Sequence, residues 1–293
     1  MKIRVAARGS KLSLAQVKVV TDYLNSQGIE TQLVEVKTRA DLFSTAPLHK
    51  LGKGVFEKEV NEVVLRGGAD LAVHSMKDLS SEMANELEIL AMPKREVPLD
   101  SLVGKYELER LEPGSKVGTG SIRRKNLLKF LRPDLNVVDI RGNVDTRLSK
   151  LNSRQYDALI LAEAGLRRLG ITASRFTLSP LDFTPEPNQG IIAIVGHKDN
   201  TRLREILKEL NHKETMEEAR AERAVVKLVG GGCHSPLGVL FKKEGSKLEG
   251  IATYSDGSKK VTVTHSDSGV PEVVGEALAR KLLKEMKNEG IIP

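Results

Sequence analysis

The chain has 293 residues, 40% hydrophobic and 29% charged, which is the balance of a soluble globular protein of two or three domains. No stretch approaches the roughly 20 apolar residues of a membrane span, and the first residues lack the apolar core of a signal peptide. A single cysteine cannot form an internal disulfide, so the composition predicts a cytoplasmic location. The net charge of +7 raises the possibility of a nucleic-acid partner, but with 3% aromatic residues and no Trp there are few stacking platforms. We therefore expect neither a nucleic-acid nor a membrane partner.

The first part of the chain alternates between strand and helix patterns. Apolar periodicity predicts strands at 3–8, 31–38 and 70–75 and helices at 13–28 and 54–68, with glycine at the end of each helix. Such alternation is typical of a largely parallel α/β sheet.

A break with two prolines, 93–100, interrupts this pattern, and a second lobe follows. Its predicted elements are a strand and turn at 115–121, a helix at 122–131, a strand at 136–142, a helix at 143–153 and a strand leading into a helix at 157–166. A second proline-rich break, 179–190, precedes an apolar strand at 191–196. Two crossings between two lobes predict a hinged cleft, where ligands commonly bind.

The last part of the chain has a different pattern. A charged amphipathic helix within 211–232 leads into a glycine loop, and antiparallel-type strands and a closing helix follow. We therefore predict three domains: an α/β lobe of residues 1–94 with 191–210, an α/β lobe of residues 95–190, and a small α+β domain of residues 211–293.

Polar clusters follow several predicted strands, at the edge where open α/β sheets bind ligands. The clusters are Arg8 to Ser10, His74 to Asp78, Thr119 to Arg124, Arg141 to Asn143 with Arg147, and Arg167 with Arg168. Helix N-termini attract anions, and arginine grips carboxylate or phosphate with two hydrogen bonds. Because the helix dipole disfavours a cation at an N-terminus, Arg123 and Arg124 are unexpected there unless an anion arrives to offset them. The sequence favours a small-polyanion site; for any single arginine the alternative is a solvated surface position.

Two residues stand apart from these basic clusters. Asp78 could stabilise a cationic intermediate or carry a proton, or it could simply pair with Lys77 or cap a helix. Cys233, in "LVGGGCHSPLG", could be a buried thiol, a nucleophile paired with His234, or a covalent anchor on a flexible loop. No metal site is predicted, because one Cys and six His stand in no ligand spacing.

The segments "RGSKLSLAQ", "HSMKDL", "GTGSIRR", "RGNVDTRL" and "GGCHSPLG" stand in the order found in the porphobilinogen deaminase (hydroxymethylbilane synthase) family, which this chain resembles from about residue 3 to beyond residue 250. The resemblance implies a monomeric transferase of tetrapyrrole and haem biosynthesis. Such an enzyme polymerises four porphobilinogen molecules head-to-tail into hydroxymethylbilane, releases ammonia and can hand its product to the next enzyme. The implied fold has two lobes like those of type II periplasmic binding proteins around a hinged cleft, plus the C-terminal α+β domain.

The resemblance also implies a role for each matching residue. Cys233 would carry a dipyrromethane cofactor through a thioether. Asp78 would contact pyrrole N–H groups, stabilise the positive charge of the azafulvene formed as ammonia leaves, and help to move the proton. The implied cofactor contacts are Ser75, Lys77, Thr119, Ser121, Arg123, Arg124, Arg141 and Gly142. The implied substrate contacts are Arg8, Ser10, Arg147, Arg168 and Gln189, and Lys53 and Phe56 would belong to a flap.

The chain departs from the family pattern in places. Gly120 stands where relatives usually have Ser, Ser80 replaces a frequent Pro, and 187–197 is looser than the family's usual motif. The alternative function is a non-catalytic two-lobe protein that binds small carboxylates or phosphates.

Overall fold

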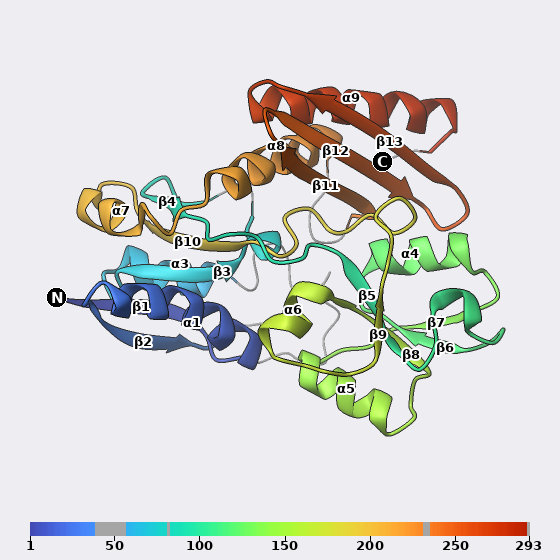
Figure 1. The fold of residues 1–293 in the computed structure, drawn as a ribbon, viewed down its shortest axis with the longest axis horizontal. Helices are drawn as coiled ribbons and strands as arrows, with labels where there is room; N and C mark the ends of the chain where they lie inside the picture. The colour runs from blue at the N-terminus through green and yellow to red at the C-terminus, as the bar shows by residue number, and fades with distance from the viewer. Residues whose placement is uncertain (39–56, 81–82, 231–234, 292–293) are drawn as a thin grey trace. The chain divides into compact units, whose positions relative to one another are not determined.

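The computed structural model describes residues 1–38, 57–80, 83–230 and 235–291 (Figure 1). The chain divides into two compact units, which we call unit 1 (Met1–Glu96 with Ile191–Met216) and unit 2 (Val97–Gly190 with Glu217–Pro293). The changes of unit near residues 96 and 190 fall in the two proline-containing breaks of the sequence. Since unit 2 contains two separate sheets, we propose that it comprises two of the three domains predicted from the sequence.

The sheet of unit 1 is mixed. In spatial order its strands are β2 (Glu30–Val36), β1 (Lys2–Arg8), β3 (Leu71–Ser75), β10 (Ile192–His197) and β4 (Leu87–Ala91). Strand β1 runs parallel to β2 and β3, as expected, but β10 is antiparallel to β3 and β4. The reason is that the chain returns from unit 2 at the end of β3, where Ile192 pairs with Ser75, so β10 must run back along it.

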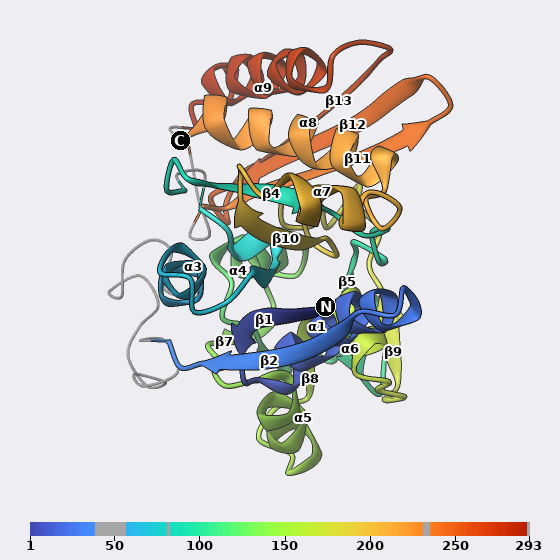
Figure 2. The ribbon, with the colours of Figure 1, turned by 90° about the vertical axis from the view of Figure 1, so that its left-hand side faces the viewer.

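Helices cover both faces of this sheet (Figures 1 and 2). They are α1 (Lys11–Ser26), α3 (Lys58–Leu65) and α7 (Thr201–Leu207). Apolar side chains of α1 and α7 share one core with Val5 and Val73. Side chains alternate between the faces of a strand, so His74 points to the opposite face, where it contacts Asn61 of α3.

The first sheet of unit 2 has the same plan. Its strands lie in the order β7 (Asn136–Val138), β6 (Lys116–Gly118), β8 (Ala158–Ala162), β5 (Asp100–Gly104) and β9 (Arg175–Thr177). Its helices are α4 (Ile122–Leu131), α5 (Val144–Asn152) and α6 (Glu163–Arg168). Strand β5 is antiparallel to β8 because the first crossing enters where β8 ends, and Asp100 pairs with Ala162 there. Asp100 therefore lies at the edge of the sheet from which α6 begins.

The remaining part of unit 2 is an antiparallel sheet with helices, as the sequence predicts. Strands β11 (Leu237–Glu244), β12 (Lys247–Ser255) and β13 (Lys260–Asp267) pack through one core with α8 (Lys213–Val229) and α9 (Pro271–Asn288). The second crossing joins this sheet, since the Val239 N–H donates to the Pro185 carbonyl (2.9 Å). Within the described residues, no helix has both the length and the apolar character needed to cross a membrane.

Candidate functional site

A small pocket with a cavity volume of about 80 Å³ lies in unit 1 where β1 and β3 end. Ten residues from β1, α1, β3, the residues that cap α1 and α3, and the turn after β3 line it: Arg8, Ser10, Leu12, Ser13, Gln16, Glu57, Val73, His74, Ser75 and Asp78. Four of the predicted site residues, Arg8, Ser10, Ser75 and Asp78, are thus brought together. A guanidinium and a carboxylate in one pocket can bind a ligand that carries both an anionic and a cationic group.

The serine hydroxyls of the pocket already have protein partners. Ser10 caps α1, and its hydroxyl accepts a hydrogen bond from the Ser13 N–H (3.2 Å). The Ser75 hydroxyl accepts one from the buried Gln16 amide (2.7 Å). Each hydroxyl is therefore fixed in direction and retains capacity for a ligand.

Lys77 and Asp78 belong to a 3₁₀ turn, Met76–Asp78, that follows β3 directly. The Met76 N–H donates to the Ile191 carbonyl (2.9 Å), and the Met76 side chain is fully buried. The turn is anchored at its first residue, and this anchor places Asp78 on the pocket wall.

His74 is an uncharged member of the pocket. Its Nε2–H donates to the Asn61 side-chain carbonyl (2.8 Å), and burial lowers the pKa of the imidazole to about 4. At neutral pH the ring is therefore neutral and adds no positive charge beside Asp78.

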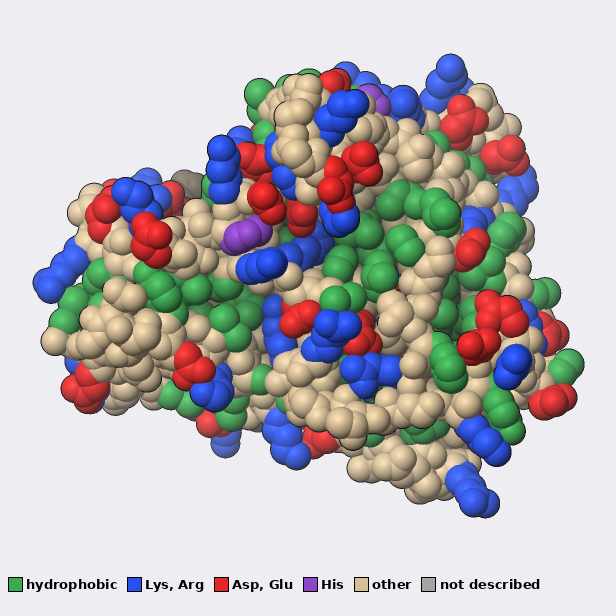
Figure 3. Space-filling view, in the orientation of Figure 1, with side chains coloured by type: hydrophobic (Ala, Val, Ile, Leu, Met, Phe, Trp, Pro, Cys, Tyr) green, Lys and Arg blue, Asp and Glu red, His purple; other side chains and the backbone are tan. Residues whose placement is uncertain are grey.

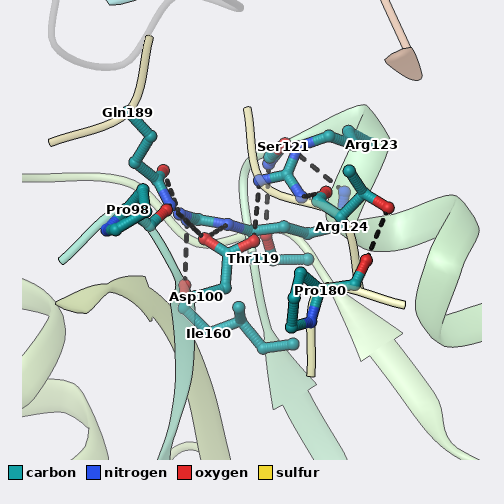
Figure 4. A network of polar contacts seen from close by, with 10 residues as sticks. Pro98, Asp100, Thr119, Ser121, Arg123, Arg124, Ile160, Pro180 and Gln189 are labelled. Atoms are coloured by element: carbon teal, nitrogen blue, oxygen red, sulfur yellow. Dashed lines mark hydrogen bonds and ion pairs between the residues drawn. The ribbon is translucent and has the colours of Figure 1, made fainter. Parts of the chain in front are cut away.

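A second group of predicted site residues surrounds Asp100 in unit 2 (Figure 4). Asp100 is fully buried and forms ion pairs with Arg123 (2.8 Å) and Arg124 (2.6 Å) at the start of α4. The Gln189 amide also donates to it (3.0 Å). The anion that the two arginines indicated is thus supplied by the chain itself.

The charge state of Asp100 follows from these contacts. Burial by itself would raise its pKa, but the positive charges of Arg123 and Arg124, with hydrogen bonds from Arg124 and Gln189, bring the pKa well below its usual value. The carboxylate stays ionised, and the guanidiniums beside it are only 2% and 6% exposed. Direct cofactor contact by Arg123 and Arg124 stays a prediction.

Gln189 and Arg168 contact the crossing segments of unit 2. The Gln189 amide donates to the Pro98 carbonyl (2.7 Å), and its oxygen accepts from Arg124 (3.3 Å). The Arg168 guanidinium donates to the Gly190 carbonyl (2.7 Å). Both residues fix the crossings, and the substrate contacts predicted for them stay predictions.

Arg141, Gly142 and Arg147 lie around the start of α5. The Arg147 Nε–H donates to the Gly142 carbonyl (2.8 Å), which is presented by a backbone with φ of +106°. Burial and the positive charges of Arg124 and Arg141 lower the pKa of Arg147 to about 10. The guanidiniums repel one another, so a carboxylate bound among them would be favoured.

The remaining predicted cofactor contacts, Thr119 and Ser121, lie in the turn before α4. The Ser121 N–H donates to the Thr119 hydroxyl (3.2 Å), and the Ser121 hydroxyl caps α4 by accepting from the Arg124 N–H (3.4 Å). A Cβ at Gly120 would lie 2.9 Å from the Ile140 carbonyl oxygen, closer than real Cβ contacts. This local backbone therefore favours glycine, where the resemblance leads one to expect serine.

Two family models match the chain. "Porphobilinogen deaminase, dipyromethane cofactor binding domain" matches residues 3–205, and "Porphobilinogen deaminase, C-terminal domain" matches residues 216–286. The chain belongs to the porphobilinogen deaminase family. Full-length relatives named probable porphobilinogen deaminase, from Metallosphaera sedula and Saccharolobus islandicus, are 60% and 58% identical over 293 residues, all of each chain.

Among solved structures, the chain is similar to a substrate-binding domain of a putative amino acid ABC transporter from Streptococcus pneumoniae, with TM-score 0.45 and 14% identity over 71% of this chain and 91% of that one. The deaminase family confirms the predicted activity: the enzyme is a transferase that polymerises porphobilinogen to hydroxymethylbilane. The family also confirms dipyrromethane as the cofactor. The alternative of a non-catalytic binding protein is not favoured.

Three predicted site residues of the deaminase, Lys53, Phe56 and Cys233, lie outside the described residues. On either side of the Cys233 segment, α8 ends at Val229 and β11 begins at Leu237.

Sequence reasoning missed Asp100, Gln16 and Glu57. Asp100 had only an indirect signal, because two arginines at a helix start need an anion but nothing near Asp100 in the sequence marks it as that anion. Gln16 and Glu57 had none, since polar residues on amphipathic helices are normally solvated.

Proposed function

We propose that Asp78 is the catalytic carboxylate of this deaminase. It accepts the pyrrole N–H of porphobilinogen and stabilises the positive charge that develops on the ring as ammonia leaves. The observation that carries this role is the pocket itself, where Asp78 lies on a backbone turn anchored by Met76, beside a neutral His74. A fixed anion aimed at developing charge is worth more in a site with little water than in bulk solvent.

We propose that the basic group of unit 2 binds the acidic arms of the dipyrromethane cofactor. These arginines suit carboxylate ligands. The positive charges of Arg124 and Arg141 lower the pKa of Arg147, and a carboxylate bound beside the three guanidiniums would relieve their repulsion. The cofactor supplies the pyrrole to which the first substrate unit is joined. Its proposed contacts are Ser75, Lys77, Thr119, Ser121, Arg123, Arg124, Arg141 and Gly142, with Cys233 as the covalent anchor.

We assign substrate binding to Arg8 and Ser10 in the pocket and to Arg147, Arg168 and Gln189 in unit 2. Arg8 is the guanidinium that shares the pocket with Asp78, so it suits a carboxylate arm of the porphobilinogen bound there. Lys53 and Phe56 remain the proposed flap residues. We further propose that the enzyme is a cytoplasmic monomer that hands its product to the next enzyme of the pathway.

On the face shown in Figure 3, Lys and Arg side chains alternate with Asp and Glu and form no single basic stripe.

Asp78→Asn tests the catalytic role. The substitution keeps the size of the side chain and removes its charge, so we expect turnover of porphobilinogen to fall by about 100-fold or more, with little change in melting temperature. Asp22→Asn is the control, because Asp22 is an exposed partner of Lys18 on α1. Turnover within a factor of two of the unmodified enzyme would remove Asp78 from the mechanism.

Intact-mass spectra of the same samples test the anchor. The unmodified enzyme should carry two pyrrole units and gain further units when porphobilinogen is added, whereas Asp78→Asn should gain them far more slowly. Active enzyme at the bare polypeptide mass of 32.1 kDa would refute attachment at Cys233. Sedimentation of these samples as a dimer would refute the proposed monomer.

A further inference from the structure

We propose that Glu57 and Asn61, at the start of α3, are positioning residues that fix the turn bearing Asp78 from both of its ends. The inference rests on the proposed role of Asp78. The two residues stand one helical turn apart, and the Asn61 N–H donates to the Glu57 carbonyl (2.8 Å), so their side chains leave the same rigid turn of α3.

Asn61 contacts the segment just before the turn. Its side-chain carbonyl accepts the Nε2–H of His74 (2.8 Å), and the two side chains are only 8% and 7% exposed. His74 is the residue before Ser75, with which β3 ends. Because burial lowers the pKa of His74 to about 4, the imidazole is neutral at pH 7, with Nε2–H as the donor to the Asn61 oxygen.

Glu57 contacts the segment just after the turn. Its carboxylate accepts the Ser80 backbone N–H (2.7 Å), and the side chain is 4% exposed. Ser80 follows Asp78 by two residues, and between them the Leu79 N–H closes the 3₁₀ turn on the Met76 carbonyl (3.1 Å). A charged acceptor makes a stronger hydrogen bond than a neutral one, especially when buried.

We call these two contacts, Asn61 with His74 and Glu57 with Ser80, the clamp. Helix α3, from whose first turn both side chains extend, is itself held in place. Val60 and Val64 of α3 are at most 1% exposed, so the helix is packed against the sheet. The two side-chain contacts therefore connect a packed helix to residues 74 and 80, on either side of Asp78. A shift of about 1 Å in a catalytic group can cost roughly 100-fold in rate, so loss of the clamp is expected to slow the reaction.

Glu57 also lines the pocket that holds Asp78, so its charge has to be separated from its hydrogen bond. Glu57→Gln keeps an oxygen that can accept the Ser80 N–H and removes the charge. Glu57→Ala removes both. Glu62→Ala is the matched control, because Glu62 is a half-exposed glutamate on the same helix that pairs with Arg66.

The test combines kinetics with hydrogen exchange of the backbone, measured by mass spectrometry on the holoenzyme. For Glu57→Ala we expect kcat to fall roughly 10- to 100-fold with KM little changed, and amide exchange in residues 76–80 to accelerate about 10-fold or more. Glu57→Gln should stay within about threefold of the unmodified enzyme in both measurements. Glu62→Ala should match the unmodified enzyme.

Several results would overturn the inference. Unchanged exchange and kcat in Glu57→Ala would do so, and so would a Glu57→Gln variant as impaired as Glu57→Ala, because the charge would then be what matters. If Glu57→Ala does not fold, Asn61→Ala decides, and normal exchange at 74–80 in that variant contradicts the clamp. An inactive Asp78→Asn beside a normal Glu57→Ala defeats the clamp alone, whereas a normal Asp78→Asn defeats the proposed function.

Discussion

Two guanidinium groups share one buried carboxylate where β5 begins. Asp100 has no exposed surface, and Arg123 and Arg124 each lie within 3 Å of one of its oxygens. Removing one member of a buried ion pair leaves charge without compensation, which costs far more than breaking an exposed pair. Asp100 therefore fixes the two arginines in their present positions.

Asp100→Asn should lower the free energy of unfolding by about 3–5 kcal/mol, because two buried cations lose their counter-ion. Chemical denaturation at pH 7 measures the loss. The control is Asp134→Asn, since Asp134 pairs with Arg132 at the surface and its loss should cost much less than the loss of Asp100. Equal effects of the two substitutions would show that the buried pairing contributes little.

Residue chemistry was only partly predictable from the sequence. The helix dipole and local position marked Arg123 and Arg124 as cations that need an anion, and the sequence analysis expected that anion to be a ligand, whereas the chain itself supplies Asp100. Asp100 was not identified as that anion, since it is 24 positions from Arg124 and meets it only after β5 pairs antiparallel with β8. Long-range pairing of this kind leaves no local pattern in the sequence.

At the scale of elements, α8 connects the C-terminal sheet to the second crossing. Glu222 of α8 is fully buried, and its carboxylate accepts the Phe241 N–H of β11 (2.8 Å) and the Asn188 N–H of the crossing. Asn188 precedes Gln189, which donates to Asp100. One side chain thus connects the helix that precedes the Cys233 segment to the buried charges of unit 2.

Glu222→Ala should therefore destabilise unit 2 by about 2–6 kcal/mol, because two buried N–H groups lose their acceptor at about 1–3 kcal/mol each. Glu222→Gln should cost about half as much, since the amide keeps one acceptor oxygen. Thermal unfolding compares these variants with Glu214→Ala, a change at an exposed side chain of the same helix. A loss below 1 kcal/mol in Glu222→Ala would contradict the buried connection.

The elements with strong local signals were predicted well. The helix expected at 122–131 is α4, whose N-cap Ser121 and buried Leu127 and Leu128 are visible as a pattern. Strands β4 and β5 and helix α7 were not predicted. The antiparallel direction of β5 and β10 also escaped prediction, since it depends on where each crossing re-enters its sheet.

At the scale of the whole molecule, each unit encloses its own hydrophobic core. The α/β class, the C-terminal antiparallel sheet and the deaminase activity were predicted from the sequence and are confirmed. The two units differ in the titratable groups that they bury. Unit 1 contains His74, whose pKa burial lowers to about 4, and unit 2 contains Asp100, whose pKa lies well below its usual value.

These groups predict that acid weakens unit 1 before unit 2. The unfolded chain binds a proton at His74 below pH 6.5, but folded unit 1 binds it only near pH 4, so stability falls by about 3 kcal/mol as the pH drops through this window. Asp100 has a lowered pKa, so its contribution to stability is complete above its pKa of about 4 in the unfolded chain and is lost only below that pH.

Hydrogen exchange at pH 7, 5.5 and 4.5, corrected for intrinsic rates, should show β1 and β3 losing protection first. His74→Gln should abolish that difference, and His197→Asn, in the same sheet, should keep it. Loss of protection in β5 and β8 at pH 5.5, before any change in β1, would contradict this order.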